Sequence, residues 1–143
     1  MNRVEKQLDR IIAGLKLNDK LKNVKFVREY GSHGAPTPIR GLVAVVSVTD
    51  MQTSSYIGDY LSSSIKGDQF CAKAQIRVYA PATENGSGLS EVVGELLQGL
   101  KKADAEKIIT KSSATSIEFD ADMNAIFRTV EIEMEFYLCR EVL

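Results

Sequence analysis

The segment AIFRTVEIEMEFYLC, residues 125–139, decides the fold of this chain. Its apolar residues recur at every second position, which is the period of a β-strand with two different faces. One face carries Ile126, Val130, Ile132, Met134, Phe136 and Leu138, with Arg128 as the exception, and the other carries Phe127, Thr129, Glu131, Glu133, Glu135, Tyr137 and Cys139. At about 3.3 Å per residue this strand exceeds 40 Å, so we expect it to be central or to extend onto a neighbour.

Three earlier segments are also predicted to be strands. Residues 41–48, GLVAVVSV, are almost wholly apolar and rich in β-branched residues, which is typical of a strand buried on both faces and ending at Thr49 and Asp50. Residues 70–79, FCAKAQIRVY, alternate between apolar and more polar side chains, and residues 108–116 form a further predicted strand.

Two helices are predicted from apolar residues that recur with a period of about 3.6. The first places Val4, Leu8, Ile11, Ile12 and Leu15 in one stripe and should end near Asn18. The second carries Leu89, Val92, Val93, Leu96, Leu97 and Leu100. We therefore expect an α+β fold in one domain spanning residues 1–143, with a mixed β-sheet of about four strands and two helices packed on one face.

Residues 49–69 lack a strong period, and a stretch of about 20 such residues in a compact domain usually has a function of its own. A short helix and a projecting hairpin both fit this segment, which we expect to be an extended loop or arm. It contains apolar side chains that need burial against a partner: Tyr56, Ile57, Tyr60 and Leu61.

The composition is that of a globular protein, with 44% hydrophobic and 26% charged residues. No apolar run approaches the roughly 20 residues of a membrane-spanning helix. The first residues open directly into a charged helical pattern without the apolar stretch of a signal peptide. We expect a soluble protein that stays in the cytoplasm unless it is carried out as part of a particle.

Charge is distributed unevenly along the chain, although the net charge is only −1. Residues 1–28 carry eight basic side chains against three acidic ones, whereas residues 116–143 carry two basic against seven acidic. Opposed ends of this kind suit a subunit that docks head-to-tail on copies of itself, and two solvated surfaces are the other interpretation.

The sequence offers little for catalysis, so we predict that the protein is not an enzyme and binds no cofactor. His33, the only histidine, lies in a glycine- and proline-rich loop with no cysteine or carboxylate near it in sequence, and no local motif supplies the partners of a catalytic base. The motifs that bind nucleotides or carry a reactive serine are missing. The two cysteines, Cys71 and Cys139, are predicted to be reduced thiols rather than a disulfide or a zinc site.

Glu131, Glu133 and Glu135 form an acidic row on one face of the long strand, about 6.6 Å apart. Such spacing is close enough to flank a cation, so a metal site is one reading. The reading we favour is a solvated sheet face on which Lys73 and Arg77 of a neighbouring strand form cross-strand ion pairs.

The second half of the chain resembles the tail-terminator (tail-completion, minor tail) proteins of phages. The segment AQIRVYAP, residues 74–81, looks like the strand of that family that ends in a Tyr-Ala-Pro motif. A glycine-rich turn, an amphipathic helix, a strand, an acidic turn with Phe119 and Asp120, and a long closing strand beginning at Phe127 and Arg128 follow in the same order. The resemblance covers most of the chain in layout and includes no catalytic signature.

The resemblance implies a ring, usually of six subunits, that caps the tail tube of a phage or a phage-tail-like bacteriocin, ends tube growth and faces the head. The partners would be other copies of this chain, the tail tube protein and a head-completion or neck protein, with DNA only as cargo in the lumen. The protein would be made in the cytoplasm of the bacterial host and end in the virion or tail particle.

Within that ring, Tyr56, Ile57, Tyr60 and Leu61 become expected contacts to the tube or to a neighbour. Glu131, Glu133 and Glu135 become an expected lumen wall that repels DNA. A neck or head–tail joining protein is the nearest alternative. A small α+β module that binds a peptide or ligand is another, and a metal-dependent enzyme is a weaker one.

Overall fold

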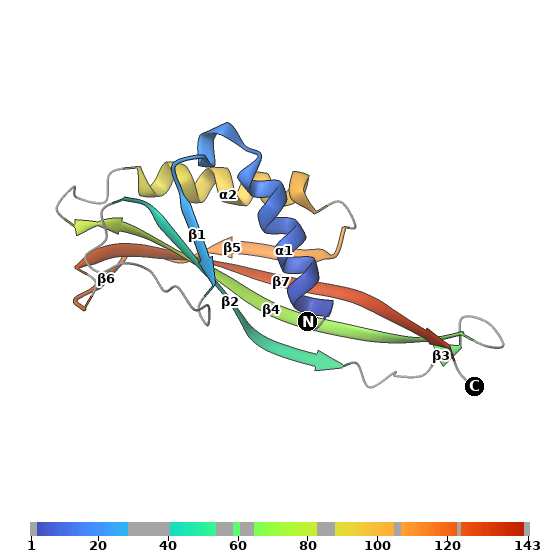
Figure 1. The fold of residues 1–143 in the computed structure, drawn as a ribbon. Coiled ribbons are helices and arrows are strands. Elements are labelled where there is room, and N and C mark those ends of the chain that lie inside the picture. Colours follow the sequence, from blue (N-terminus) through green and yellow to red (C-terminus); the bar gives the residue numbers. More distant parts are fainter. Residues whose placement is uncertain are drawn as a thin grey trace.

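In the computed structural model, which describes residues 3–28, 41–53, 59–60, 65–82, 88–104, 107–122 and 124–141, two helices pack on one twisted sheet (Figure 1). The helices are α1 (Arg3–Lys16) and α2 (Leu89–Ala103), with a single 3-10 turn, η1 (Asp19–Leu21), after α1. The strands are β1 (Lys25–Arg28), β2 (Val43–Thr53), β3 (Asp59–Tyr60), β4 (Ile65–Pro81), β5 (Ile109–Ala114), β6 (Glu118–Asp120) and β7 (Ala125–Glu141). The α+β class predicted from the sequence is therefore confirmed.

The sheet is mixed and runs in the order β1-β2-β4-β7-β5, with β3 added to β4 and β6 added to β7. Only β1 and β2 are parallel, and the other pairs are antiparallel. The strand count exceeds the predicted four. β1 was not expected, because residues 25–28 are too few to show an alternating pattern.

β4 and β7 form the backbone of the fold as two antiparallel strands of 17 residues each. They pair without a register shift from Ile65 opposite Glu141 to Pro81 opposite Ala125. The expectation of a long central strand at residues 125–139 is confirmed, since β7 lies between β4 and β5. Two strand ends were predicted wrongly: β2 runs past Asp50 to Thr53, and β4 begins five residues before Phe70.

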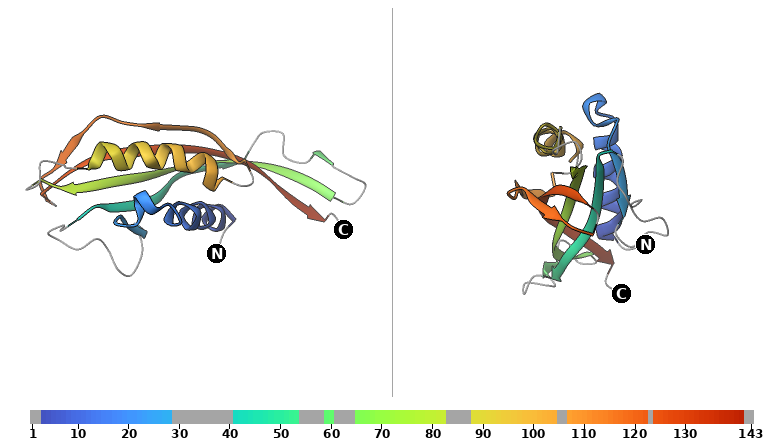
Figure 2. Two further views of the ribbon diagram at one scale, coloured as in Figure 1. Left: turned by 90° about the horizontal axis from the view of Figure 1, so that it is seen from above. Right: turned by 90° about the vertical axis from the view of Figure 1, so that its left-hand side faces the viewer.

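The main core lies between the helices and one face of the sheet. It combines the predicted helical stripes with alternate residues of the strands, including Ala74, Ile76 and Val78 of β4 and Val130 and Ile132 of β7, all at most 1% exposed. Figure 2 shows both helices lying over the same side of the sheet. The expectation that two helices cover one face is confirmed.

A smaller apolar cluster lies on the opposite face, at the end of the sheet where β7 begins. It consists of Val43, Tyr79, Ala125 and Phe127, and the rings of Tyr79 and Phe127 lie 5.2 Å apart between centroids. Val43 and Ala44 are buried on opposite faces of β2, which agrees with the predicted two-sided burial of residues 41–48. The open, polar part of this face is therefore limited to the middle of the sheet.

The two helices touch closely near their C-terminal ends. A Cβ atom built on Gly14 would lie only 2.9 Å from the Cβ of Ala103, and one on Gly99 would lie 3.0 Å from Leu15. Glycine therefore sets the distance between α1 and α2. Gly94, by contrast, has open space around it within the same helix α2.

We predict opposite effects of alanine at these glycines. Gly14→Ala should lower the free energy of unfolding by about 1 kcal/mol, because overpacking costs about 1–3 kcal/mol and exceeds the gain in helix propensity. Gly94→Ala should raise it by about 0.5–1 kcal/mol, because only the propensity gain remains. Urea denaturation of both variants measures the two changes in the free energy of unfolding. Changes of the same sign would contradict the close contact between the helices at Gly14.

Candidate functional site: the open face of the sheet

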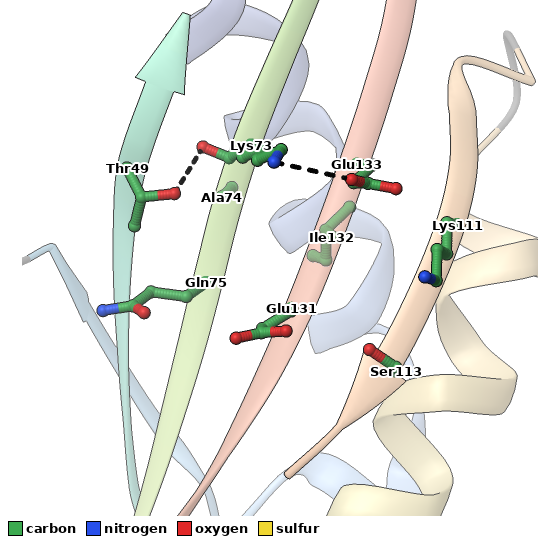
Figure 3. Close-up of a pocket in the computed structure, with 9 residues that line it drawn as sticks. All are labelled: Thr49, Lys73, Ala74, Gln75, Lys111, Ser113, Glu131, Ile132 and Glu133. Carbon is green, nitrogen blue, oxygen red and sulfur yellow. Dashed lines mark hydrogen bonds and ion pairs between the residues drawn. The ribbon is translucent and has the colours of Figure 1, made fainter.

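The face of the sheet that points away from the helices carries the acidic row of β7. Glu131 is exposed, and Glu133 and Glu135 are half-buried, with buried Val130, Ile132 and Met134 between them on the helix side. A shallow pocket of about 190 Å³ lies over the middle of this face (Figure 3). Its lining comes from four strands and comprises Thr49, Lys73, Ala74, Gln75, Lys111, Ser113, Glu131, Ile132 and Glu133.

Glu133 lies between two lysines. Lys73 of β4 is its register partner on one side, and the two side chains form an ion pair of 3.8 Å between Nζ and Oε1. Lys111 of β5 is its register partner on the other side. The side chains of Lys73 and Glu133 are 59% and 44% exposed, so the ion pair contributes at most about 1 kcal/mol. The predicted cross-strand pairing of Lys73 with the glutamate row is confirmed.

Arg77 does not join the acidic row, contrary to the sequence prediction. Its register partner on β7 is Thr129, and its guanidinium carbon lies 5.0 Å from the centroid of the Phe127 ring. Arg77 therefore stacks on the smaller apolar cluster, where the negative face of the aromatic ring attracts its charge.

Both flanking strands carry a β-bulge at the level of the Lys73–Glu133 pair. In β2 the register shifts between Val48 and Asp50, which leaves Thr49 as the extra residue, and Thr49 Oγ1 donates a hydrogen bond of 3.2 Å to the carbonyl of Lys73. In β5 the extra residue is Thr110, and its Oγ1 donates to the carbonyl of Glu133, also at 3.2 Å. Bulges increase strand twist locally, so this level marks a bend across the sheet.

The open face is nearly balanced in charge. Its described carboxylates are Asp50, Glu118, Asp120, Glu131, Glu133 and Glu135, and its described cations are Lys25, Lys73, Arg77 and Lys111. Sequence reasoning found the acidic row but not Lys111 or Ser113, because the register of β5 on β7 depends on the bulge at Thr110. The face therefore has no excess of positive charge that would hold nucleic acid.

The pocket on this face offers little binding capacity. Pockets for small organic ligands usually have volumes of about 300–1,000 Å³, well above that of this one. In the part of the chain that the structure describes, no group of three or more His, Cys, Asp or Glu side chains comes together to hold a metal ion. The interpretation of the acidic row as a metal site thus receives no support from the described geometry. His33 lies outside the residues that the structure describes.

The predicted arm residues fall mostly outside the described part. Tyr56, Ile57 and Leu61 are not described. The backbone of Tyr60 belongs to β3 and pairs with Lys66 of β4, while its side chain is not described. Strand structure at residues 49–53, 59–60 and 65–69 favours the hairpin over the helix for this segment.

The cysteines are too far apart to form a disulfide within the chain. Cys71 is a free thiol that pairs in register with Glu135, whereas Cys139 pairs with Gly67. Four positions along β4 separate the two levels, which corresponds to about 13 Å, and a disulfide requires Cα atoms within about 7 Å.

Several exposed apolar side chains were not singled out from the sequence as exposed. Leu17 is 85% exposed after α1, and Ile117 and Phe119 are 53% and 60% exposed around β6. Leu17 follows Leu15 by two residues and so lies on the opposite side of a helix from the apolar stripe, which was a sign of exposure in the sequence. For Phe119, the position beside Asp120 and Asp122 was the only signal, since apolar residues within an acidic turn are unusual.

Comparison with known proteins gives no relative for this chain: neither a protein-family model nor a curated protein matches its sequence. Within the described ranges, neither helix has the length and apolar character that a bilayer-spanning helix needs.

Proposed function

We propose that this chain is a structural assembly protein that caps the tail tube of a phage or phage-tail-like bacteriocin as a homo-oligomeric ring. The observation that carries the proposal is the projecting part of β4 and β7. These strands continue beyond the two helices, as Figures 1 and 2 show from different directions. The resemblance of residues 74–139 to tail-terminator proteins supports the same assignment.

Few other strands pair with the projecting part of β4 and β7. β5 pairs with β7 only as far as Met134, and β2 pairs with β4 only as far as Phe70. Beyond these levels, the described backbone consists of β4, β7 and the two residues of β3. A narrow ribbon without a second layer is only marginally stable in water, so this arm suits a protein that lays it on a neighbouring subunit or on the tube.

The open face of the sheet suits the wall of a lumen. It lies opposite the helices, it is polar in its middle part, and it has two more described carboxylates than cations. A near-neutral, slightly acidic wall lets a polyanion pass without binding it. Glu131, Glu133 and Glu135 are the residues we assign to this wall.

The partners in this proposal are other copies of the chain, in a ring of six, together with the tail tube protein and a head-completion or neck protein. DNA is cargo only. Assembly takes place in the cytoplasm of the bacterial host, and the protein then stays in the particle. A neck or head–tail joining protein would use the same arm and face, and its ring would bind the head side rather than stop the tube.

Polymerisation of the tail tube protein of the same particle tests the capping role. Adding the purified chain should end tube growth at short lengths, with a ring visible at one tube end by negative-stain electron microscopy. Tubes that grow as long with the chain as without it, and that carry no ring, would contradict the proposal.

Neutralising the acidic row tests the lumen wall. We predict that the triple change Glu131→Gln, Glu133→Gln and Glu135→Gln leaves ring assembly intact but lowers infectivity or slows DNA ejection, because Lys73 and Lys111 then give the face a net positive charge. A plaque assay and an ejection assay measure the effect. The matched control is Lys111→Gln, which should not slow ejection, and unchanged ejection in the triple variant would exclude the lumen role.

A further inference from the structure

The turn between β6 and β7 is an exposed apolar tip surrounded by acid. Ile117 and Phe119 are two residues apart, and Phe119 pairs in register with Ile126, which faces the helix side. Residues 117–124 include three carboxylates and no basic residue. Asp120 accepts a hydrogen bond of 3.0 Å from the backbone N–H of Asp122, which holds the turn in shape. We call Ile117, Phe119 and the turn to Asp122 the acidic tip.

A groove on the helix side has the complementary character. It has a volume of about 660 Å³ and is lined only by α1, α2 and the segment that follows α1: Gly14, Leu15, Leu17, Asn18, Asp19, Lys20, Glu95, Gln98, Gly99, Lys102 and Ala103. Gly14 and Gly99 lie in its lining, packed against Ala103 and Leu15 of the other helix, and the exposed Leu17 belongs to the same lining. We call it the helix groove.

Lysines dominate the surroundings of the helix groove. Residues 14–22 and 95–104 contain five lysines against three acids. Two of the acids are already engaged: Glu95 contacts Lys20 at 3.3 Å and Asn18 at 3.4 Å, and Asp104 accepts hydrogen bonds from the backbone N–H groups of Ile108 and Ile109. The lining itself is balanced, with Lys20 and Lys102 against Asp19 and Glu95, and the exposed Lys16, Lys22 and Lys101 beside it supply the positive charge that an incoming acidic group meets.

The acidic tip cannot fill the helix groove of its own chain. β6 pairs with the first residues of β7, at the end of the sheet near the start of α2, whereas the groove lies at the C-terminal half of α2. Figure 1 shows β6 at the end of the sheet opposite the projecting arm and below the helix layer. Contact between the two surfaces therefore joins different copies of the chain.

We propose that the acidic tip of one copy docks in the helix groove of the next copy. Phe119 and Ile117 pack against Leu17 and the apolar part of the groove lining, and Asp122 faces Lys102 or its neighbour Lys101. Such a contact is heterologous, because it joins unlike surfaces, and it closes into a ring when the rotation per subunit permits. The inference rests on the proposed ring and names the surfaces that hold it together.

The edges of the sheet are a less suitable contact between copies. The outer strand β5 is interrupted by a bulge at Thr110, and β2, which β1 covers only from Val43 to Val46, carries a bulge at Thr49. Bulged edges disfavour the addition of a further strand from another chain. The tip and the groove supply instead the exposed apolar area and the opposite charges that a subunit contact needs.

Native mass spectrometry and sedimentation of the variants, alone and on tail tubes, test the docking. Phe119→Asp and Leu17→Asp should each weaken ring formation at least tenfold, because both residues lie at the centre of the contact. Ser90→Asp, which adds a charge to an exposed position of α2, is the matched control and should assemble normally. Unfolding midpoints equal to that of the unmodified chain show that each variant folds.

A charge exchange tests the pairing itself. Asp122→Lys and Lys102→Glu should each weaken assembly, and the double variant should recover most of it. Rings that persist unchanged in Phe119→Asp and Leu17→Asp would overturn the docking while leaving the capping ring intact. If the unmodified chain forms no ring alone or on tubes, the proposed function fails, and the docking fails with it.

Discussion

Replacing Ile132 by alanine is expected to lower the free energy of unfolding by about 2–5 kcal/mol. Ile132 is fully buried on the helix side of β7, where Ala74 of β4 and Ser112 of β5 are its register partners. Small neighbours cannot expand to fill the space that the isoleucine side chain leaves. The change therefore combines lost burial of apolar surface with a residual cavity between the helices and the sheet. Chemical denaturation followed by circular dichroism measures the loss.

The adjacent residue provides the matched control for this prediction. Glu131 is exposed on the opposite face of the same strand, so Glu131→Gln should change the free energy of unfolding by no more than about 0.5 kcal/mol. The loss in the free energy of unfolding should thus be about fourfold larger or more for Ile132→Ala than for Glu131→Gln. Similar losses at both positions would contradict the assignment of one buried and one open face to β7.

Replacing the four apolar residues of the arm by serine is expected to abolish assembly of the ring on its tube. Tyr60 belongs to β3, whose backbone pairs with the projecting part of β4, and Tyr56, Ile57 and Leu61 are its neighbours in the sequence. Aromatic and large aliphatic anchors carry most of the binding energy at subunit contacts, so their joint loss should weaken binding by several orders of magnitude. Co-sedimentation with tail tubes measures the loss.

The body of the protein should not be affected by this change. The main core that the structure describes is formed by the helices and the helix-facing residues of β2, β4 and β7. The matched control replaces Ser62, Ser63 and Ser64 of the same segment by alanine and should bind tubes normally. Normal binding by the fourfold serine variant would rule out the arm as the contact.

The alternation and the helical periods predicted the centre of the fold correctly. Residues 125–139 lie within one long central strand, and the stripes of both helices lie in the core. These predictions succeeded because one face of each element is buried and the other is not, which leaves a period in the sequence.

The parts that were missed depend on neighbours in space. Residues 25–28 form a strand only because β2 offers them a parallel edge, and four residues are too few for a pattern. β2 continues past Asp50 because the bulge at Thr49 shifts its register, which brings Asp50 opposite Lys73. Neither effect is visible in local sequence.

The candidate site was predicted only in part, because some of its contacts also depend on neighbours in space. The glutamate row follows from the period of β7 alone, and its pairing with Lys73 follows from two neighbouring strands. The approach of Lys111 on the other side and the stacking of Arg77 on Phe127 depend on register and on a second apolar cluster. The helix groove depends on glycines that allow two helices to touch, a feature that neither helix shows alone.

Native mass spectrometry combined with negative-stain imaging shows whether this chain assembles into a ring. The purified chain is measured over a range of concentrations, alone and with tail tubes. We expect closed rings, six subunits in size, with a central hole, either free or seated on a tube end. A chain that stays monomeric at every concentration and leaves the tube ends bare would contradict the proposed ring.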